Sequence, residues 1–236
     1  MIFAVILAGG TGSRMGISDM PKQFLELKGK PILNHTLEKF LPHPRFEKII
    51  VLSPKTWIGH TREIIRRYTG ESDRIAVIEG GETRNETIMN AVAYIEQNYG
   101  LDDDTVIVTH DSVRPFVTYR IIEENIDAAL RCGACDTVIP ATDTIVEGAD
   151  DAITAIPDRR RMYQGQTPQS FKAKMLRDAY RSLSDSEKAV LTDAAKILVI
   201  KGKTVCLVRG ETYNIKITYP YDLRIARSLL EEENDD

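Results

Sequence analysis

The chain has 236 residues, of which 42% are hydrophobic and 28% charged, and its formal net charge is −4. This composition is typical of a globular domain with a substantial core, and the lack of a basic surplus argues against a nucleic-acid-binding protein. No apolar run approaches the roughly 18 residues of a membrane helix, and the N-terminus has no charged region followed by a small-residue cleavage site. We therefore expect no membrane contact, no signal peptide and a cytoplasmic location.

The first predicted strand, Phe3–Leu7, runs directly into the glycine-rich segment GGTGSRMG at residues 9–16. Glycines let backbone N–H groups approach an anion closely. Arg14 and Lys22 add two positive charges near the same place. The segment has neither the spacing of a dinucleotide fingerprint nor the Gly-Lys-Ser/Thr ending of a P-loop. The glycines alone would fit a structural turn, but the two cations favour a site for the phosphates of a nucleoside triphosphate.

Short Val- and Ile-rich runs alternate with amphipathic helical segments along the chain. The predicted strands are Phe3–Leu7, Lys48–Leu52, Ile75–Ile78, Thr105–Thr109, Thr137–Pro140 and Thr204–Val208. Apolar stripes at helical spacing lie within Arg84–Asn98, around Ile122 and Ile126, and from Leu223 to Leu230. This alternation predicts an α/β fold with a doubly wound, mainly parallel sheet that binds ligands at the carboxyl ends of its strands. We expect a single domain over residues 1–236.

One stretch breaks the alternation. Residues 143–147 and 152–156 read as two strands around a Gly- and Asp-rich turn. A hairpin with so little core of its own should project as an arm, at about residues 143–160, and pack on a second subunit. The alternative is an exposed surface hairpin.

The three cysteines include a C-x-x-C pair, Cys132 and Cys135, while Cys206 lies far along the chain. Such a pair can signal redox or zinc chemistry. No second Cys/His pair completes a zinc site, and the pair spans a predicted helix end and strand start, so a structural role is favoured.

Polar segments follow several of the predicted strands. Gly80–Asn85 opens a helix and offers a second set of backbone amides, although a plain loop capped by Thr83 or Asn85 would explain it as well. Asp111 follows the fourth strand and suits a magnesium ligand, the alternative being an ion pair with Arg114 that fixes the loop. Lys216 places a cation after the last strand, where a solvated surface lysine is the commoner case.

These segments together resemble a known family. The runs LAGGTGSRMG, PKQF, GGETRNET, HDSVRP, DTI, QTPQSF, LTDAAKI and NIKIT occur in the order seen in the 2-C-methyl-D-erythritol 4-phosphate cytidylyltransferase family. HDSVRP, RNETIMN and TDAAKI are more similar to its ribitol-5-phosphate branch. The resemblance spans nearly the whole chain and implies a Rossmann-like nucleotidyltransferase fold with a projecting β-hairpin arm.

The resemblance also implies roles for individual residues. Arg14 and Lys22 would bind the triphosphate and stabilise the transition state, and Asp111 would help to hold Mg²⁺. The residues implied around CTP are Leu7, Ala8, Gly9, Gly10, Gly80, Gly81, Glu82, Arg84, Thr87 and Ser112. Those implied around the polyol phosphate are Arg114, Thr144, Arg159, Thr167 and Lys216, with Arg159 and Lys216 also counted as catalytic. In the family the hairpin crosses to a second subunit of a homodimer, so Arg159 would serve the partner's site; the adjoining Arg160 and Arg161 are alternatives to it.

The chemistry so implied is attack of a polyol phosphate on CTP with release of pyrophosphate. A phosphate monoester is largely ionised at pH 7, since its second pKa is about 6, and so needs no general base. The remaining task is to bring two anions together, which cations and Mg²⁺ would ease. The sequence leaves open ribitol against methylerythritol phosphate. A non-catalytic scaffold is disfavoured by the set Arg14, Lys22, Asp111 and Lys216, and a hydride-transferring Rossmann enzyme by the glycine pattern.

Overall fold

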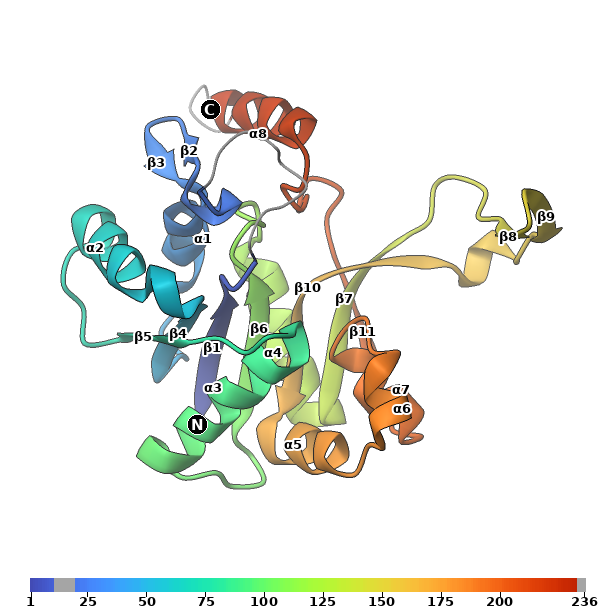
Figure 1. The fold of residues 1–236 in the computed structure, drawn as a ribbon, viewed down its shortest axis with the longest axis horizontal. Coiled ribbons are helices and arrows are strands. Elements are labelled where there is room, and N and C mark those ends of the chain that lie inside the picture. The colour runs from blue at the N-terminus through green and yellow to red at the C-terminus, as the bar shows by residue number, and fades with distance from the viewer. Residues whose placement is uncertain (11–19, 233–236) are drawn as a thin grey trace.

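A computed structural model describes residues 1–10 and 20–232. Its centre is a seven-stranded sheet in the order β11-β7-β10-β6-β1-β4-β5 (Figure 1). The strands are β1 (Ile2–Leu7), β4 (Lys48–Ser53), β5 (Ile75–Glu79), β6 (Val106–Asp111), β7 (Ala134–Pro140), β10 (Tyr163–Lys172) and β11 (Cys206–Arg209). The mainly parallel α/β sheet predicted from the sequence is confirmed.

The interior strand β10 was not predicted. It runs antiparallel to both β6 and β7, whereas the other neighbouring strands pair in parallel. Its sequence has no apolar alternation because several of its polar side chains are buried. Their neighbours supply the hydrogen bonds: the Ser170 hydroxyl donates to Asn125 Oδ1 at 3.1 Å, for example. Tertiary partners therefore stabilise a strand that its own pattern does not indicate.

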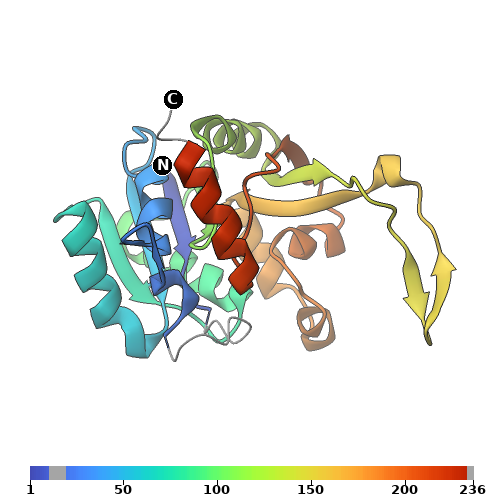
Figure 2. The same cartoon turned by 90° about the horizontal axis from the view of Figure 1, so that it is seen from above.

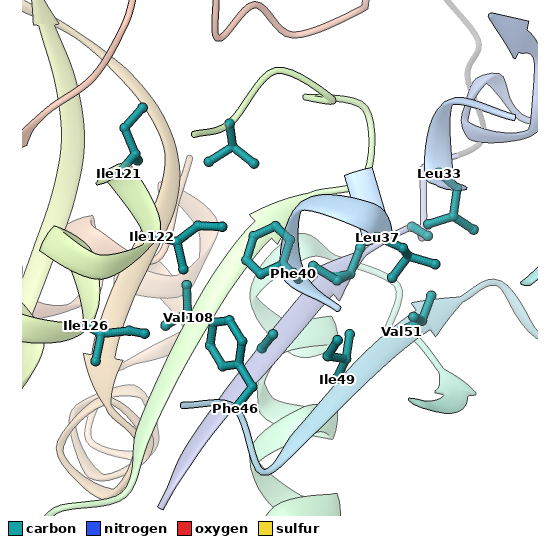
Figure 3. Packing of buried hydrophobic residues seen from close by; sticks show 14 of the residues in the cluster. Leu33, Leu37, Phe40, Phe46, Ile49, Val51, Val108, Ile121, Ile122 and Ile126 are labelled. Atoms are coloured by element: carbon teal, nitrogen blue, oxygen red, sulfur yellow. The ribbon is translucent and has the colours of Figure 1, made fainter. Parts of the chain in front are cut away.

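Helices cover both faces of the sheet. On one face lie α1 (Ile32–Phe40), α2 (Ile58–Thr69) and α4 (Tyr119–Cys132). On the other lie α3 (Arg84–Tyr99), α5 (Ala173–Arg181) and α7 (Ala195–Ile200), with the short α6 (Asp185–Ala189) beside them. Figure 3 shows the first core layer, in which Phe40, Phe46 and Val108 interlock with α4 side chains. The predicted stripe of α3, formed by Ile88, Ala91, Val92 and Ile95, is buried in the second layer.

A smaller apolar cluster lies at the carboxyl end of the sheet. Its members include Leu27, Val113 and Ile217, together with Ala226 of α8 (Pro220–Glu232). Leu27 belongs to the short strand β2 (Glu26–Leu27), which pairs with β3 (Lys30–Pro31) and follows η1 (Lys22–Phe24). Figure 2 shows α8 lying across this end of the molecule. This packing holds the segments that carry Lys22, Ser112 and Lys216 near one another.

The segment that interrupts the alternation forms a separate two-stranded sheet. Strands β8 (Glu147–Ala149) and β9 (Ala152–Ala155) pair antiparallel and lie away from the central sheet (Figures 1 and 2). The predicted strand over 143–147 is wrong, because pairing starts only at Glu147. Asp150 and Asp151 form the turn with φ of 50° and 61°, a backbone that Asp tolerates better than most residues. The side chains of Val146, Ile153 and Ile156 are exposed.

The cysteines do not act as a C-x-x-C unit. Cys132 at the end of α4 forms a disulfide with Cys206 on β11, a link that the sequence did not predict. Cys135 is buried and free, and burial raises the pKa of its thiol to about 12. A thiol that stays protonated is a poor nucleophile and metal ligand, so Cys135 is a structural residue.

Candidate active site

A cavity of about 390 Å³ opens at the carboxyl ends of β1 and β6. This is the position at which open α/β sheets bind ligands. The described residues that line it are Leu7, Gly9, Gly10, Lys22, Gln23, Gly81, Glu82, Thr83, Arg84, Thr87, Asp111, Ser112, Val113, Lys216 and Thr218. Segments far apart in sequence thus line one cavity, and most of the residues predicted to bind the nucleotide are among its lining residues.

The Gly80–Gly81 turn and the start of α3 form one wall. Thr83 caps the helix in a reciprocal capping box with Glu86, so the capping alternative holds for Thr83 and not for Asn85. The Thr87 hydroxyl accepts from the Gly81 N–H at 2.9 Å and donates to the Thr83 carbonyl at 2.8 Å. Thr87 therefore shapes this turn as well as lining the cavity. Gly81 is required sterically, since a Cβ there would lie 2.4 Å from Glu86 Cβ.

The end of β1 and the segment around Lys22 form the opposite wall. Leu7, Gly9 and Gly10 line the cavity, whereas Ala8 is buried behind them. The Gln23 amide donates to the Ala8 carbonyl at 2.7 Å and fixes the backbone at the strand end. Lys22 lines the cavity although it is only 8% exposed. Arg14 lies outside the described residues, so its predicted role stays a prediction.

Asp111 at the end of β6 is surrounded by three cations. Its Oδ2 lies 2.8 Å from Lys216 Nζ and 3.7 Å from Arg114 Nε, and its Oδ1 lies 3.7 Å from Arg84 Nε. Burial raises the pKa of Asp111, but Arg84, Lys216 and Arg114 lower it more, so that it falls well below its ordinary value. The carboxylate is ionised at neutral pH, and Lys216 is a partner of Asp111 and not a solvated surface lysine.

A hydrogen-bonded network lies directly behind Asp111. His110 Nε2 lies 3.0 Å from the Arg114 carbonyl, and His110 Nδ1 lies 3.0 Å from the Thr167 hydroxyl. A carbonyl can only accept, so Nε2 carries the proton and the Thr167 hydroxyl donates to Nδ1. The same hydroxyl accepts from the Asp111 N–H at 3.1 Å. Burial lowers the pKa of His110 to about 4, which keeps the ring neutral as this network requires.

Two residues predicted to grip the polyol phosphate make hydrogen bonds within the protein. The Thr167 hydroxyl is committed to His110 and Asp111, and Thr167 does not line the cavity. Arg114 is 9% exposed and donates to the Asn214 carbonyl at 2.8 Å. The Asn214 amide in turn donates to the Thr167 carbonyl at 2.9 Å. These bonds tie the segment before Lys216 to β6 and β10 and hold Asp111 and Lys216 in place. The substrate contacts of Arg114 and Thr167 stay predictions.

The arm residues lie outside this cavity. Thr144 is exposed, and Arg159, on η3 (Arg159–Arg161), donates to the Thr142 carbonyl at 2.8 Å. Neither residue lines the cavity of its own chain. Within one chain the structure thus brings together Lys22, Arg84, Asp111, Ser112 and Lys216, and leaves Thr144 and Arg159 apart.

Sequence reasoning missed Gln23, which lines the cavity, and His110 and Asn214, whose side chains support the site from behind. Gln23 and His110 fall within runs already quoted, PKQF and HDSVRP, where the neighbouring Lys22 and Asp111 drew the functional interpretation. His110 and Asn214 both contact Thr167, which lies 57 and 47 positions away from them, and no local pattern shows such contacts.

The fold and this cavity define a nucleotidyltransferase-type α/β protein, with backbone amides and cations gathered at the carboxyl edge of the sheet. The family model described as 2-C-methyl-D-erythritol 4-phosphate cytidylyltransferase (IspD) matches residues 2–232. The chain belongs to this family. It is 55% identical over 234 residues to the ribitol-5-phosphate cytidylyltransferase of Lactiplantibacillus plantarum, which covers 99% of this chain and 100% of the relative.

Solved structures of the same family are similar to this chain. The 4-diphosphocytidyl-2C-methyl-D-erythritol synthase of Anaerococcus prevotii is 27% identical, with a TM-score of 0.80 over 98% of this chain and 96% of that one. The 2-C-methyl-D-erythritol 4-phosphate cytidylyltransferase of Francisella tularensis is 29% identical, with a TM-score of 0.78 over 97% and 99% of the two chains. Among the described residues no helix is long and apolar enough to cross a bilayer.

Proposed function

We propose that the protein transfers CMP from CTP to D-ribitol 5-phosphate, giving CDP-ribitol and pyrophosphate. The observation that carries this proposal is the arrangement of Lys22, Arg84 and Lys216 around a cavity lined by the buried, ionised carboxylate of Asp111. The choice of ribitol over methylerythritol is supported by the identity of 55%, along its full length, to a ribitol-5-phosphate cytidylyltransferase.

The residues of the site suit phosphoryl chemistry without a general base. The attacking group is a phosphate monoester, already ionised at pH 7. Backbone amides at Gly9, Gly10 and Gly81 would hold the nucleotide, and Lys22 with Arg14 would neutralise charge that develops toward the leaving pyrophosphate. Lys216 would hold the attacking phosphate in line with the α-phosphate, which accounts for its place beside Asp111 at the cavity floor.

We propose Mg²⁺ as the cofactor, with Asp111 as its protein ligand. Mg²⁺ is commonly bound by one or two carboxylates together with substrate phosphates, and Asp111 is an ionised carboxylate that lines the cavity. No cluster of three or more His, Cys, Asp or Glu that could hold a metal occurs among residues 1–10 and 20–232, so the ion would depend on the nucleotide for its other ligands. When bound, Mg²⁺ would offset phosphate charge.

We propose a homodimer in which the hairpin arm of each subunit packs on the other subunit. Thr144 and Arg159 do not reach the cavity of their own chain, and the hairpin carries exposed Val146, Ile153 and Ile156. A two-fold partner would bury these side chains and receive Arg159 at its polyol-phosphate site. Apart from CTP and the polyol phosphate, we propose no other partner.

CDP-ribitol is an activated polyol, so we propose that the enzyme serves cell-wall biogenesis through teichoic-acid-type polymers, and that it works in the cytoplasm, where CTP is available. The test is pyrophosphate release, measured with CTP, UTP and ATP against ribitol 5-phosphate and 2-C-methyl-D-erythritol 4-phosphate. We expect turnover with CTP and ribitol 5-phosphate. Preference for methylerythritol phosphate would reassign the acceptor, and no turnover in any combination would favour the scaffold alternative.

A further inference from the structure

Gln23 lines the cavity, but the proposed reaction gives it no task. The residue is 1% exposed, and its side-chain amide donates to the Ala8 carbonyl at 2.7 Å. Ala8 is equally buried, at 1% exposed. Buried polar groups need a partner within the protein, so the Gln23 amide and the Ala8 carbonyl satisfy one another across 15 positions of sequence.

The Ala8 carbonyl lies where β1 ends and the glycine segment begins. The Ala8 N–H donates to the Leu52 carbonyl of β4 at 2.9 Å, which extends the sheet pairing by one residue. Gln23 then holds the carbonyl of the same residue, directly before Gly9 and Gly10, which line the cavity. The direction in which the backbone enters the glycine segment therefore depends on Gln23.

Gln23 is also the middle residue of η1, the short turn that carries Lys22. The Phe24 N–H donates to the Pro21 carbonyl at 3.0 Å, and the Leu25 N–H donates to the Lys22 carbonyl at 3.1 Å. Phe24 is 3% exposed and belongs to the first core layer. In so short and closed a turn, the bond that Gln23 makes also sets the position of the Lys22 backbone. The Lys22 side chain lines the same cavity as the two glycines.

The two segments that Gln23 connects serve the same phosphates in the proposed reaction. Gly9 and Gly10 would present backbone amides, and Lys22 would present a positive charge. Lys22 follows Gly10 by 12 positions, so chain connectivity alone does not set the distance between them. Groups that stabilise a transition state must be held to within about 0.5 Å of the productive geometry by the residues behind them.

We propose that Gln23 is a positioning residue, whose amide holds the glycine segment and Lys22 at one separation so that both act on the same phosphates. The inference rests on the proposed function, because it takes the triphosphate as the group that both segments contact. The position requires a hydrogen-bond donor. An ionised glutamate would bring a carboxylate against the Ala8 carbonyl, two acceptors with no proton between them.

A double-mutant cycle on pyrophosphate release tests this inference. Gln23→Met keeps the length and flexibility of the side chain but donates no hydrogen bond. We expect it to lower kcat about tenfold in the wild type, with KM for CTP within about twofold, but to lower kcat only about twofold once Lys22 is alanine. A residue that only stabilises the fold would lower kcat by the same factor in both backgrounds.

The matched control is Gln97→Met, the same substitution at an exposed glutamine of α3. A Gln23→Met variant that behaves like this control, that raises KM with kcat unchanged, or that lowers kcat equally with and without Lys22 would overturn the inference. Gln23→Leu serves the same cycle if Gln23→Met does not fold. A wild type that releases no pyrophosphate with any acceptor would refute the proposed function and this inference with it, whereas an active wild type with an additive cycle would refute this inference alone.

Discussion

Lys216 Nζ lies 2.8 Å from Asp111 Oδ2, although the two residues are 105 positions apart in the chain. This pair joins the end of β6 to the segment before α8, and both residues line the cavity. The Lys216 ammonium lowers the pKa of Asp111, after the larger effect of Arg84, against the raising effect of burial. The pair therefore keeps a buried carboxylate ionised beside the cations that the proposed reaction needs.

Replacement of Lys22 or Arg14 should slow turnover more than it weakens substrate binding. Each would stabilise charge at the transferring phosphate, and the loss of one such contact typically costs about 10²–10³ in kcat. Steady-state kinetics of Lys22→Ala and Arg14→Ala check this, with the exposed Lys203→Ala as control. Near-normal kcat in either variant, with the fold intact by circular dichroism, would remove that residue from the mechanism.

Asp111→Asn should raise the Mg²⁺ concentration needed for half-maximal activity, because an amide oxygen carries no charge to bind the ion. The variant also deprives Lys216 and Arg84 of their shared partner, so kcat should fall as well. A Mg²⁺ titration of wild type, Asp111→Asn and the control Asp104→Asn measures the shift. Undiminished wild-type activity in excess chelator would contradict a metal-dependent reaction.

Active sites shared between subunits should allow complementation. If Arg159 serves the partner's site, a mixed dimer of Arg159→Ala and Lys22→Ala chains has one site with both lesions and one with neither. Activity should partly return after subunit exchange. Arg67→Ala is a matched control, since Arg67 is exposed and pairs with Glu63 of its own chain at 3.1 Å. A verified mixed dimer without recovery, or a monomer in sedimentation at working concentration, would refute exchange.

Gly81→Ala should weaken CTP binding and destabilise the start of α3. The added Cβ would lie 2.4 Å from Glu86 Cβ and 2.8 Å from backbone atoms, so the turn must shift. Gly59→Ala, within α2, meets nothing within 4 Å and serves as control. Thermal unfolding and CTP titration compare the two variants. Equal behaviour of both would show that the turn tolerates a side chain.

Stability should depend on pH through His110 and Asp136 in opposite senses. Between pH 6.5 and about 4 the unfolded state protonates His110 while the native state does not, so acidification lowers the free energy of unfolding by about 3 kcal/mol. Burial raises the pKa of Asp136 to about 7. Between pH 7 and about 4 native Asp136 binds a proton that the unfolded state does not bind, so acidification raises the free energy of unfolding.

Replacing one of these two groups should therefore leave the pH dependence of stability that the other group contributes. In Asp136→Asn, the free energy of unfolding should fall more steeply with acid than in the wild type, and in His110→Gln it should fall less steeply. Urea denaturation at intervals from pH 7 to 4 measures the slopes. The same slope in all three proteins would contradict both shifted pKa values.

The amphipathic stripes and apolar strands were readable from sequence because the buried positions repeat with the period of the element itself. Phe3–Leu7 and the stripe around Ile88 are examples: Phe3–Ile6 and the stripe are buried as predicted, and Leu7 is partly buried. The glycines at 9–10 and 80–81 were readable for a similar reason, since a close backbone approach needs residues without side chains. With the ordered runs that mark the family, these local signals were enough to predict the fold class and the location of the site.

Only the tertiary structure decided that β10 lies inside the sheet between β7 and β6, that Lys216 pairs with Asp111, and that the Thr167 hydroxyl contacts His110. Each depends on partners far away in sequence, and a polar side chain has no period that reveals its partner. A buried polar group must find a hydrogen bond or an opposite charge, and which one it finds is fixed when the strands pack. The sequence by itself determined which elements form and which residues could do chemistry, whereas packing determined which of them meet.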